Sequence, residues 1–187
     1  MHRLLPIGDR STWHAPKLSP WLVRASTPFL RLALRLQRIT ALELRGLQHL
    51  EQALRAGHGI LITPNHVTYA DPLLLAEAAA RVKRPFHYMT AWQVFGQSRL
   101  KGLLLPRFGC FSVDREGSNR RSFETAVELL VASAHPLVVF PEGEMHHLND
   151  RVQPFHAGAA AMLLAAAERT RRGLVRLPCG LKYFYDG

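Results

Sequence analysis

From Arg45 onward, short apolar segments alternate with longer segments that have a helical pattern. The apolar segments are compact and bounded by Gly, Pro or charged residues, as β-strands are; they lie at 59–63, 86–90, 109–113, 137–140 and 174–178. The longer segments are rich in Ala, Leu, Glu and Arg, which favour helices; they lie at 47–56, 72–82, 92–104, 119–134 and 157–169. This alternation predicts an α/β domain with a mostly parallel sheet flanked by helices, whose functional residues lie in loops after the strands.

The first 40 residues have a different pattern, and we divide the chain into an N-terminal amphipathic helical segment, 1–40, and a domain over 41–187. Ser19-Pro20 and Thr27-Pro28 each fit the start of a helix, which predicts two short helices or one kinked helix. At about 100° per residue, four arginines share one helix face and large apolar residues lie off it. The arginines are Arg24, Arg31, Arg35 and Arg38, and the apolar residues are Trp21, Leu22, Phe29, Leu30, Leu34 and Leu36.

Two interpretations of this N-terminal segment stay open. A basic amphipathic helix can lie in a membrane interface, with its apolar face at the acyl boundary and its guanidinium groups near lipid phosphates. The same pattern fits an ordinary helix that packs on the protein's own core with a solvated arginine face. Pro28 counts against one continuous helix.

Composition narrows the class of protein. Hydrophobic residues make up 48% and charged residues 20% of the chain, which fits a globular protein and excludes wholesale disorder. The longest stretch without a charge or an internal histidine, 157–167, is shorter than the roughly 18 residues that a bilayer span needs. The net charge of +10 indicates an anionic partner: nucleic acid, a membrane surface or a phosphorylated substrate.

The cysteines and the N-terminus bear on the compartment. Cys110 and Cys179 provide neither a disulfide framework nor metal-site spacing. Residues 1–20 lack the apolar core of a secretory signal. We therefore predict a cytoplasmic protein, with both cysteines as core residues.

The segment with the strongest chemical pattern is PNHVTYADP at 64–72, directly after the strand predicted at 59–63. Asp71 before Pro72 is predicted to be a helix N-cap, which places His66 in a strand-to-helix loop. An imidazole there can take a proton from a hydroxyl while a carboxylate holds its other nitrogen. Thr68 is poorly placed as a nucleophile, so we predict direct attack by a substrate hydroxyl on an activated acyl group. The alternative is a loop histidine beside a simple helix cap.

Two other loops follow predicted strands in the same way. Arg115 comes just after 109–113, and its planar guanidinium group suits a phosphate. Glu142 and Gly143 end the sequence FPEG at 140–143; the glutamate can orient Arg115 or an acceptor, and the glycine allows close approach of a ligand to the backbone. Taken singly, Arg115 fits a surface ion pair and FPEG a plain turn. Their shared position after successive strands favours a joint site with His66.

Together these segments resemble the glycerolipid acyltransferases typified by 1-acylglycerol-3-phosphate acyltransferase, over roughly residues 40–180. Residues 65–71 resemble the N-H-x-[S/T]-x-x-D block of that family, and 109–115 and 140–143 are similar to its second and third blocks. Leu177-Pro178 lies where a fourth, short block is expected, and PFHAG at 154–158 is similar to the stretch that follows the third block. The chain ends soon after the fourth block, where family members usually continue, so we expect a truncated or minimal member.

The resemblance implies the family's fold and an O-acyltransferase of phospholipid biosynthesis. It implies His66 as general base, Asp71 as its partner, and an acceptor site formed by Asn65, Thr68, Arg115, Glu142 and Gly143. Acyl-CoA or acyl carrier protein would be the co-substrate, with no metal and no bound cofactor, and the acceptor would be a lysophospholipid or a glycerol-phosphate-type alcohol. Such a protein would lie peripherally on the cytoplasmic, inner face of an anionic membrane and would not bind nucleic acid.

One departure from the family pattern bears on the acceptor. Members typically continue the third block with Thr-Arg-Ser, whereas this chain has Glu144-Met145-His146. Glu144 would repel a phosphate unless it points away or pairs with a cation. An inactive lipid-binding member of the same fold therefore stays an alternative, as does a basic nucleic-acid-binding protein, although the chain has no motif for the latter. A metal site formed by the histidines at 146, 147 and 156 lacks supporting ligand spacing.

Overall fold

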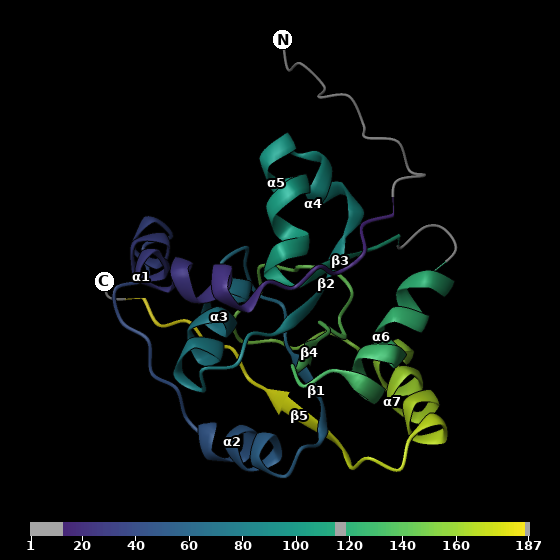
Figure 1. The fold of residues 1–187 in the computed structure, drawn as a ribbon. Coiled ribbons are helices and arrows are strands. Elements are labelled where there is room, and N and C mark those ends of the chain that lie inside the picture. Colours follow the sequence, from purple (N-terminus) through teal and green to yellow (C-terminus); the bar gives the residue numbers. More distant parts are fainter. Residues whose placement is uncertain (1–12, 115–118, 186–187) are drawn as a thin grey trace.

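The computed structural model describes residues 13–114 and 119–185. Its centre is a five-stranded sheet with the order β3-β2-β4-β1-β5. The strands are β1 (Gly59–Pro64), β2 (His87–Ala91), β3 (Cys110–Val113), β4 (Leu137–Val138) and β5 (Leu174–Cys179). All four strand pairings are parallel, which confirms the predicted α/β fold and its parallel sheet (Figure 1).

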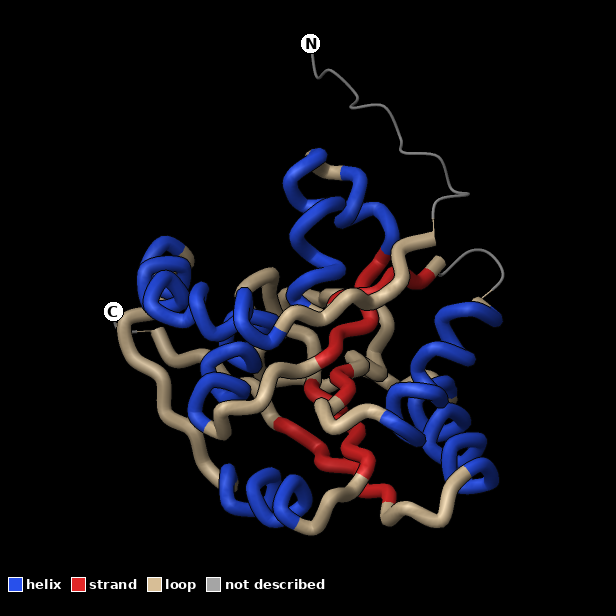
Figure 2. The backbone as a smooth tube through the Cα atoms, in the orientation of Figure 1, coloured by secondary structure: helices blue, strands red, loops and turns tan. Residues whose placement is uncertain are grey.

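Helices cover both faces of this sheet. They are α1 (Pro20–Leu36), α2 (Leu47–Arg55), α3 (Asp71–Arg81), α4 (Trp92–Gly96), α5 (Arg99–Leu104), the 3-10 helix η1 (Leu105–Phe108), α6 (Arg120–Ala132) and α7 (Gly158–Arg169). Figure 2 shows α6 and α7 together on one side of the strands, with α1, α2 and α3 on the other.

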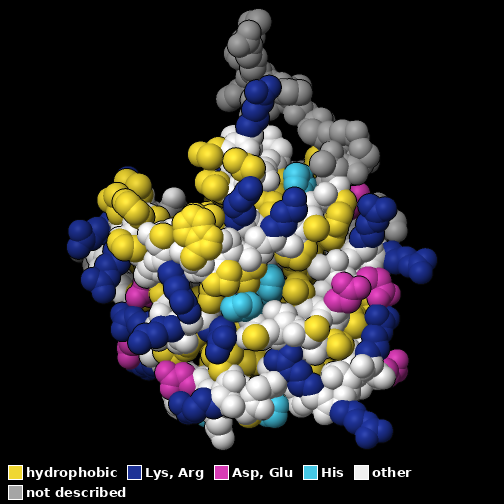
Figure 3. Space-filling model, viewed as in Figure 1, with side chains coloured by type: hydrophobic (Ala, Val, Ile, Leu, Met, Phe, Trp, Pro, Cys, Tyr) yellow, Lys and Arg dark blue, Asp and Glu magenta, His cyan; other side chains and the backbone are white. Residues whose placement is uncertain are grey.

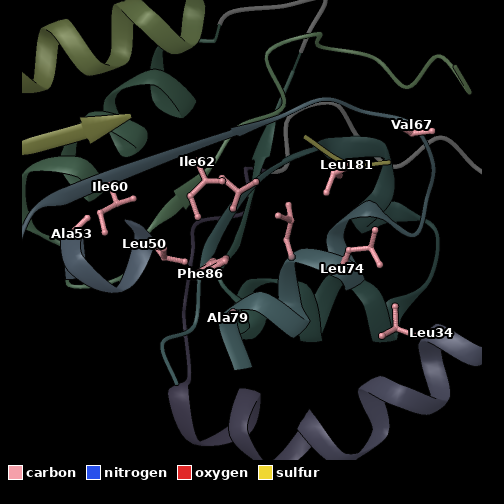
Figure 4. Close-up of a cluster of buried hydrophobic side chains, with 12 residues drawn as sticks. Leu34, Leu50, Ala53, Ile60, Ile62, Val67, Leu74, Ala79, Phe86 and Leu181 are labelled. Atoms are coloured by element: carbon pink, nitrogen blue, oxygen red, sulfur yellow. The ribbon is translucent and has the colours of Figure 1, made fainter. Parts of the chain in front are cut away.

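Strand β1 explains why two helical layers form. All six of its residues are buried, and successive side chains point to opposite faces of the sheet. Ile60 and Ile62 join the cluster shared with α1, α2 and α3, part of which is drawn in Figure 4. Leu61 joins the second cluster, which includes residues of α6 and α7. A strand that is apolar on both faces therefore requires helices on both sides.

The helix predicted over 92–104 is wrong as one element, because the structure divides it into α4 and α5. The division falls at Ser98, whose extended backbone (φ −160°) leaves the helical region. Its side-chain oxygen accepts a hydrogen bond from the Lys101 N–H at 3.1 Å. Ser98 is thus the N-cap of a new helix rather than an interior residue of a long one.

Of the two alternatives predicted for the N-terminal segment, two short helices are wrong, because a single helix, α1, begins at Ser19-Pro20 and contains Pro28. The kink at Pro28 stays a prediction. Pro28 has no N–H to donate to the preceding turn, yet the helix continues. In that turn the Thr27 hydroxyl donates to the Val23 carbonyl at 3.2 Å. Buried Leu34 anchors α1 in the core, and α1 packs against α3. Arg38 follows the helix at φ 60°, so it does not extend the arginine stripe.

A buried histidine at the amino-terminal edge of the sheet makes the fold sensitive to acid. His87 lies at the start of β2, where its Nδ1–H donates to the Gly109 carbonyl and Nε2 accepts from the Ser133 hydroxyl, both at 3.3 Å. Burial lowers the pKa of His87 to about 4. Below its ordinary pKa the unfolded chain binds a proton that the folded chain excludes, so stability is lost as the pH falls from about 6.5 toward 4.

We expect this histidine to contribute roughly 3 kcal/mol to the loss of unfolding free energy over that range. Urea denaturation of the intact chain at a series of pH values measures it. The variant His87→Gln should show a clearly flatter pH dependence, because it removes the titrating group. His49→Gln changes an exposed histidine and is the matched control. An equal pH slope in wild type and His87→Gln would contradict the assignment.

Candidate active site

The structure brings His66 and Asp71 together at the carboxyl edge of β1. His66 Nδ1 lies 2.8 Å from Asp71 Oδ2. Because a carboxylate accepts, Nδ1 carries the proton in this pair, and Nε2 of the neutral ring is left with its lone pair. The His66 side chain is 16% exposed, whereas Asp71 is fully buried. The pair therefore has the form of a general base supported from behind by a carboxylate.

Asp71 was predicted to be a helix N-cap, and this prediction is wrong. Helix α3 begins at Asp71 itself, after Ala70, so Asp71 lies in the first turn. Its Oδ2 reaches back to accept the N–H groups of Val67 at 2.6 Å and Thr68 at 3.0 Å. The carboxylate thus folds the 66–70 loop around itself, which fixes the position of His66.

Tyr183 is a fourth partner of Asp71 that the sequence did not reveal. Its hydroxyl donates to Asp71 Oδ1 at 2.6 Å. Burial, together with the hydrogen bond to Asp71, raises the pKa of Tyr183, so the phenol keeps its proton and remains a donor. Both oxygens of the buried carboxylate are therefore satisfied from opposite sides.

Two asparagines hold the segment that carries Tyr183. Asn65 accepts from the Leu181 N–H at 2.6 Å and donates to the Leu181 carbonyl at 3.0 Å. Asn149 makes the same two bonds with the backbone of Tyr183, both at 2.7 Å. Each amide side chain thus accepts from the N–H and donates to the carbonyl of the same residue, as the backbone of a neighbouring strand would. The described contacts of Asn65 are thus with the chain itself, and its role in acceptor binding stays a prediction.

Glu142 lies in the same site and is also buried. Its Oε1 accepts the His66 N–H at 3.0 Å, and its Oε2 accepts the Gln153 N–H at 3.3 Å. Glu142 therefore joins the His66 loop to the loop that precedes α7. Thr68 has a similar local role, because its hydroxyl oxygen accepts the Ala70 N–H at 2.8 Å. For both residues, acceptor binding stays a prediction.

The backbone conformation at position 143 requires a glycine. Gly143 has φ 74°, in the left-handed region, and a Cβ there would lie 2.8 Å from the His156 ring. Its N–H donates to the Phe140 carbonyl at 3.1 Å, so this group is not free to bind an oxyanion. Phe140 in turn stacks on the His66 ring, with 4.1 Å between the ring centres. Phe140 and His156 are thus further site residues that the motif did not single out.

Arg115, predicted to bind the acceptor phosphate, lies outside the described residues.

A cleft of about 1710 Å³ opens beside His66. It extends between α1 and α3 and along β2, and it reaches Lys83 and Arg84 after α3. Most of its lining is apolar, including Leu30, Ala76, Ala80, Tyr88 and Cys110. Burial raises the pKa of the Cys110 thiol to about 11, which suppresses its thiolate form and fits a lining residue rather than a nucleophile.

Tyr183→Phe tests how far the new hydrogen bond supports the site. The variant leaves Asp71 Oδ1 without this donor, and we expect a loss of about 1–3 kcal/mol in the free energy of unfolding. Urea denaturation measures this loss. Tyr185→Phe is the matched control, because Tyr185 is 81% exposed. Equal stability of the two variants would contradict a structural role for the Tyr183 hydroxyl.

The fold and the site together combine a parallel α/β sheet with a His–Asp pair in the loop after β1, an inner strand of that sheet. The family model described as Acyltransferase matches residues 42–182. The chain therefore belongs to this family, which comprises glycerolipid acyltransferases such as 1-acylglycerol-3-phosphate acyltransferases. No curated protein matches the chain.

Two further properties bear on the class. Within 13–114 and 119–185, no helix is long and apolar enough to cross a membrane. In the same residues, no group of three His, Cys, Asp or Glu side chains is placed to hold a metal ion. The family membership supports acyltransferase activity with an acyl donor and a lipid acceptor.

Proposed function

We propose that this protein is an O-acyltransferase that moves a fatty acyl group from acyl-CoA or acyl carrier protein to a hydroxyl of a lysophospholipid or glycerol-phosphate-type acceptor. The observation that carries the proposal is the His66–Asp71 pair, which leaves Nε2 as the basic nitrogen beside a large apolar cleft. Family membership supplies the reaction type. The acyl thioester is a co-substrate, and the proposed reaction needs no bound cofactor.

In the proposed reaction His66 Nε2 takes the proton of the acceptor hydroxyl as its oxygen attacks the thioester carbonyl carbon. A new C–O bond forms, and the carbonyl electrons move to oxygen. When they return, the C–S bond breaks and the leaving sulfur takes the proton from the imidazolium. Asp71, 2.8 Å from Nδ1, stabilises the cation that exists between these steps.

Two features of the cleft bear on which substrates it would bind. Its apolar lining can remove an acyl chain from water, which favours binding by roughly 0.8 kcal/mol for each buried CH₂ group. Glu144, which lines the cleft near His66, is exposed and has no ion-pair partner within the described part of the chain. A carboxylate there disfavours a phosphate close to the reacting hydroxyl. Within the proposed acceptor class, this favours lysophospholipids whose phosphate carries a cationic head group over lysophosphatidic acid.

We also propose that the protein works at the cytoplasmic, inner surface of an anionic membrane and that α1 binds there. This helix carries three arginines on one face: Arg24, Arg31 and Arg35. The acyl chain of the donor and the lysolipid acceptor each partition into bilayers, so a peripheral enzyme meets them at that surface.

Purified protein incubated with acyl-CoA and a panel of acceptors tests the proposal, with free thiol and acylated product measured together. The panel contains lysophosphatidic acid, lysophosphatidylethanolamine, other lysophospholipids and neutral alcohols. We expect acceptor-dependent thiol release, and we expect Glu144→Thr to shift the preference toward lysophosphatidic acid by several-fold. Binding of lysolipids with no turnover of any donor would instead indicate an inactive lipid-binding member of the family.

A further inference from the structure

Helix α1 is apolar on the side that faces away from the core. Four large apolar side chains on it are between 56% and 75% exposed: Trp21, Phe29, Leu32 and Leu36. At about 100° per residue they fall within a sector of about 80° whose centre is opposite buried Leu34. The helix therefore has one apolar face against α3 and a second that is uncovered, with its arginines between the two. A group of large apolar side chains exposed on one side of a helix indicates an interaction surface.

Helix α5 repeats this combination on a smaller scale. Leu100 and Leu103 lie on one side of it and are 63% and 55% exposed. Arg99 and Lys101 are exposed beside them. Arg107, in the following η1, donates to the Leu103 carbonyl at 2.7 Å, which holds a third cation at the end of the helix.

The two helices are fixed relative to each other. The chain just before α1 bonds to η1, with the Lys17 N–H on the Pro106 carbonyl and the Ser19 N–H on the Arg107 carbonyl, both at 2.9 Å. Both elements also line the cleft that leads to His66, through residues such as Thr27 of α1 and Lys101 of α5. Figure 3 shows the apolar side chains gathered over α1 and over α5, with Lys and Arg side chains between them.

The charge of these two regions is of one sign. The sequence has no Asp or Glu over 10–42 or over 78–113, the segments that contain α1 and α5. Exposed apolar side chains in segments whose charged residues are all cations match the interface of an anionic bilayer, where the apolar groups enter the acyl boundary and the cations meet lipid phosphates.

We infer that α5 is a second membrane-binding element, which docks on an anionic lipid bilayer together with α1 so that the cleft that both helices line opens toward the lipid. If the proposed function holds, a lysolipid or acyl chain can pass from the bilayer into the cleft without crossing water. The docking itself does not depend on that function, because it rests on the exposed faces of α1 and α5.

Co-flotation of the full chain with phosphatidylcholine vesicles, with and without phosphatidylglycerol, tests this inference. The double variant Leu100→Gln/Leu103→Gln should weaken partitioning into anionic vesicles by roughly tenfold or more, as should Trp21→Gln/Leu32→Gln. Leu164→Gln is the matched control, because Leu164 is 67% exposed on α7, in the opposite helical layer. It should change partitioning by less than about twofold. Thermal melting confirms that each variant is folded, and the single α5 variants replace the double one if it is not.

The inference is overturned if the α5 variants float like wild type, if Leu164→Gln loses as much binding, or if wild type does not bind anionic vesicles. The proposed function is read separately, from thiol release with short-chain acyl-CoA and a water-soluble acceptor in the absence of vesicles. We expect the α5 double variant to retain that activity, since neither leucine lines the cleft. Loss of flotation with this activity retained would support the docking role, and flotation without any transferase activity would refute only the proposed function.

Discussion

Replacement of His66 with alanine is expected to lower the rate of acyl transfer by roughly 10²–10⁴-fold. The variant removes the nitrogen that is proposed to take the proton of the acceptor, while the rest of the cleft lining is retained. Thiol release at saturating acyl-CoA and acceptor measures the effect as kcat. The fold should persist, because the contacts that position Asp71 through Val67, Thr68 and Tyr183 do not involve the His66 ring.

The control for this variant is His49→Ala on α2, which removes an exposed imidazole far from β1's carboxyl edge. It should have the kcat of wild type. Retention of most activity in His66→Ala, with an unchanged circular dichroism spectrum, would eliminate His66 as the general base. If His66→Ala loses both activity and cooperative unfolding, His66→Gln separates the catalytic effect from the structural one. It keeps a polar side chain of similar length and should be equally inactive.

The sheet could be predicted because its strands are buried on both faces. Gly59–Pro64 and the other parallel strands appear in the sequence as short apolar runs between helical patterns, and this signal is local. The break at Ser98 was missed because apolar periodicity extends across it. The side chain that starts a new helix there acts within one turn and leaves the hydrophobic pattern unchanged.

The motif predicted His66 and Asp71 as a pair, but it did not reveal what holds them. Tyr183 is 112 residues from Asp71 in sequence, and its approach depends on the asparagine contacts at Leu181 and Tyr183. Only tertiary structure brings these groups together. The spacing of Asn65 and Asp71 in the motif contains no information on Tyr183, which follows the last strand, β5.

The N-terminal pattern illustrates a second limit. Periodicity identified the arginine stripe of α1 but grouped all the large apolar residues as one set. Packing separates them, since Leu34 is buried in the core whereas Trp21 and Leu36 are exposed. A helix that is apolar on two sides has a weak one-sided pattern, so its second face becomes visible only when the partner of the first is known.

Replacement of Asp71 with asparagine is expected to lower kcat by roughly 10²–10⁴-fold with little change in the KM of either substrate. The amide oxygen can take the position of Oδ2 and keep the donors of the 66–68 loop, while the amide nitrogen faces the Tyr183 oxygen. The loop geometry then persists, but the negative charge that is proposed to stabilise the imidazolium is lost. Asp71→Ala is the comparison, because it also removes the acceptor of the buried Val67 N–H and of the partly buried donors of Thr68 and Tyr183. It should destabilise the fold by several kcal/mol, at about 1–3 kcal/mol for each donor left unpaired.

The double variant His66→Ala/Asp71→Asn decides whether Asp71 acts through His66. If the carboxylate serves only to orient and stabilise that imidazole, Asp71→Asn has nothing further to remove once the ring is gone, and the double variant should match His66→Ala in kcat within about twofold. If the two losses instead multiply, Asp71 acts on the substrate or on the structure by a separate route. The burial of Asp71 argues against a direct route to the substrate, because a carboxylate with no exposed surface cannot contact one.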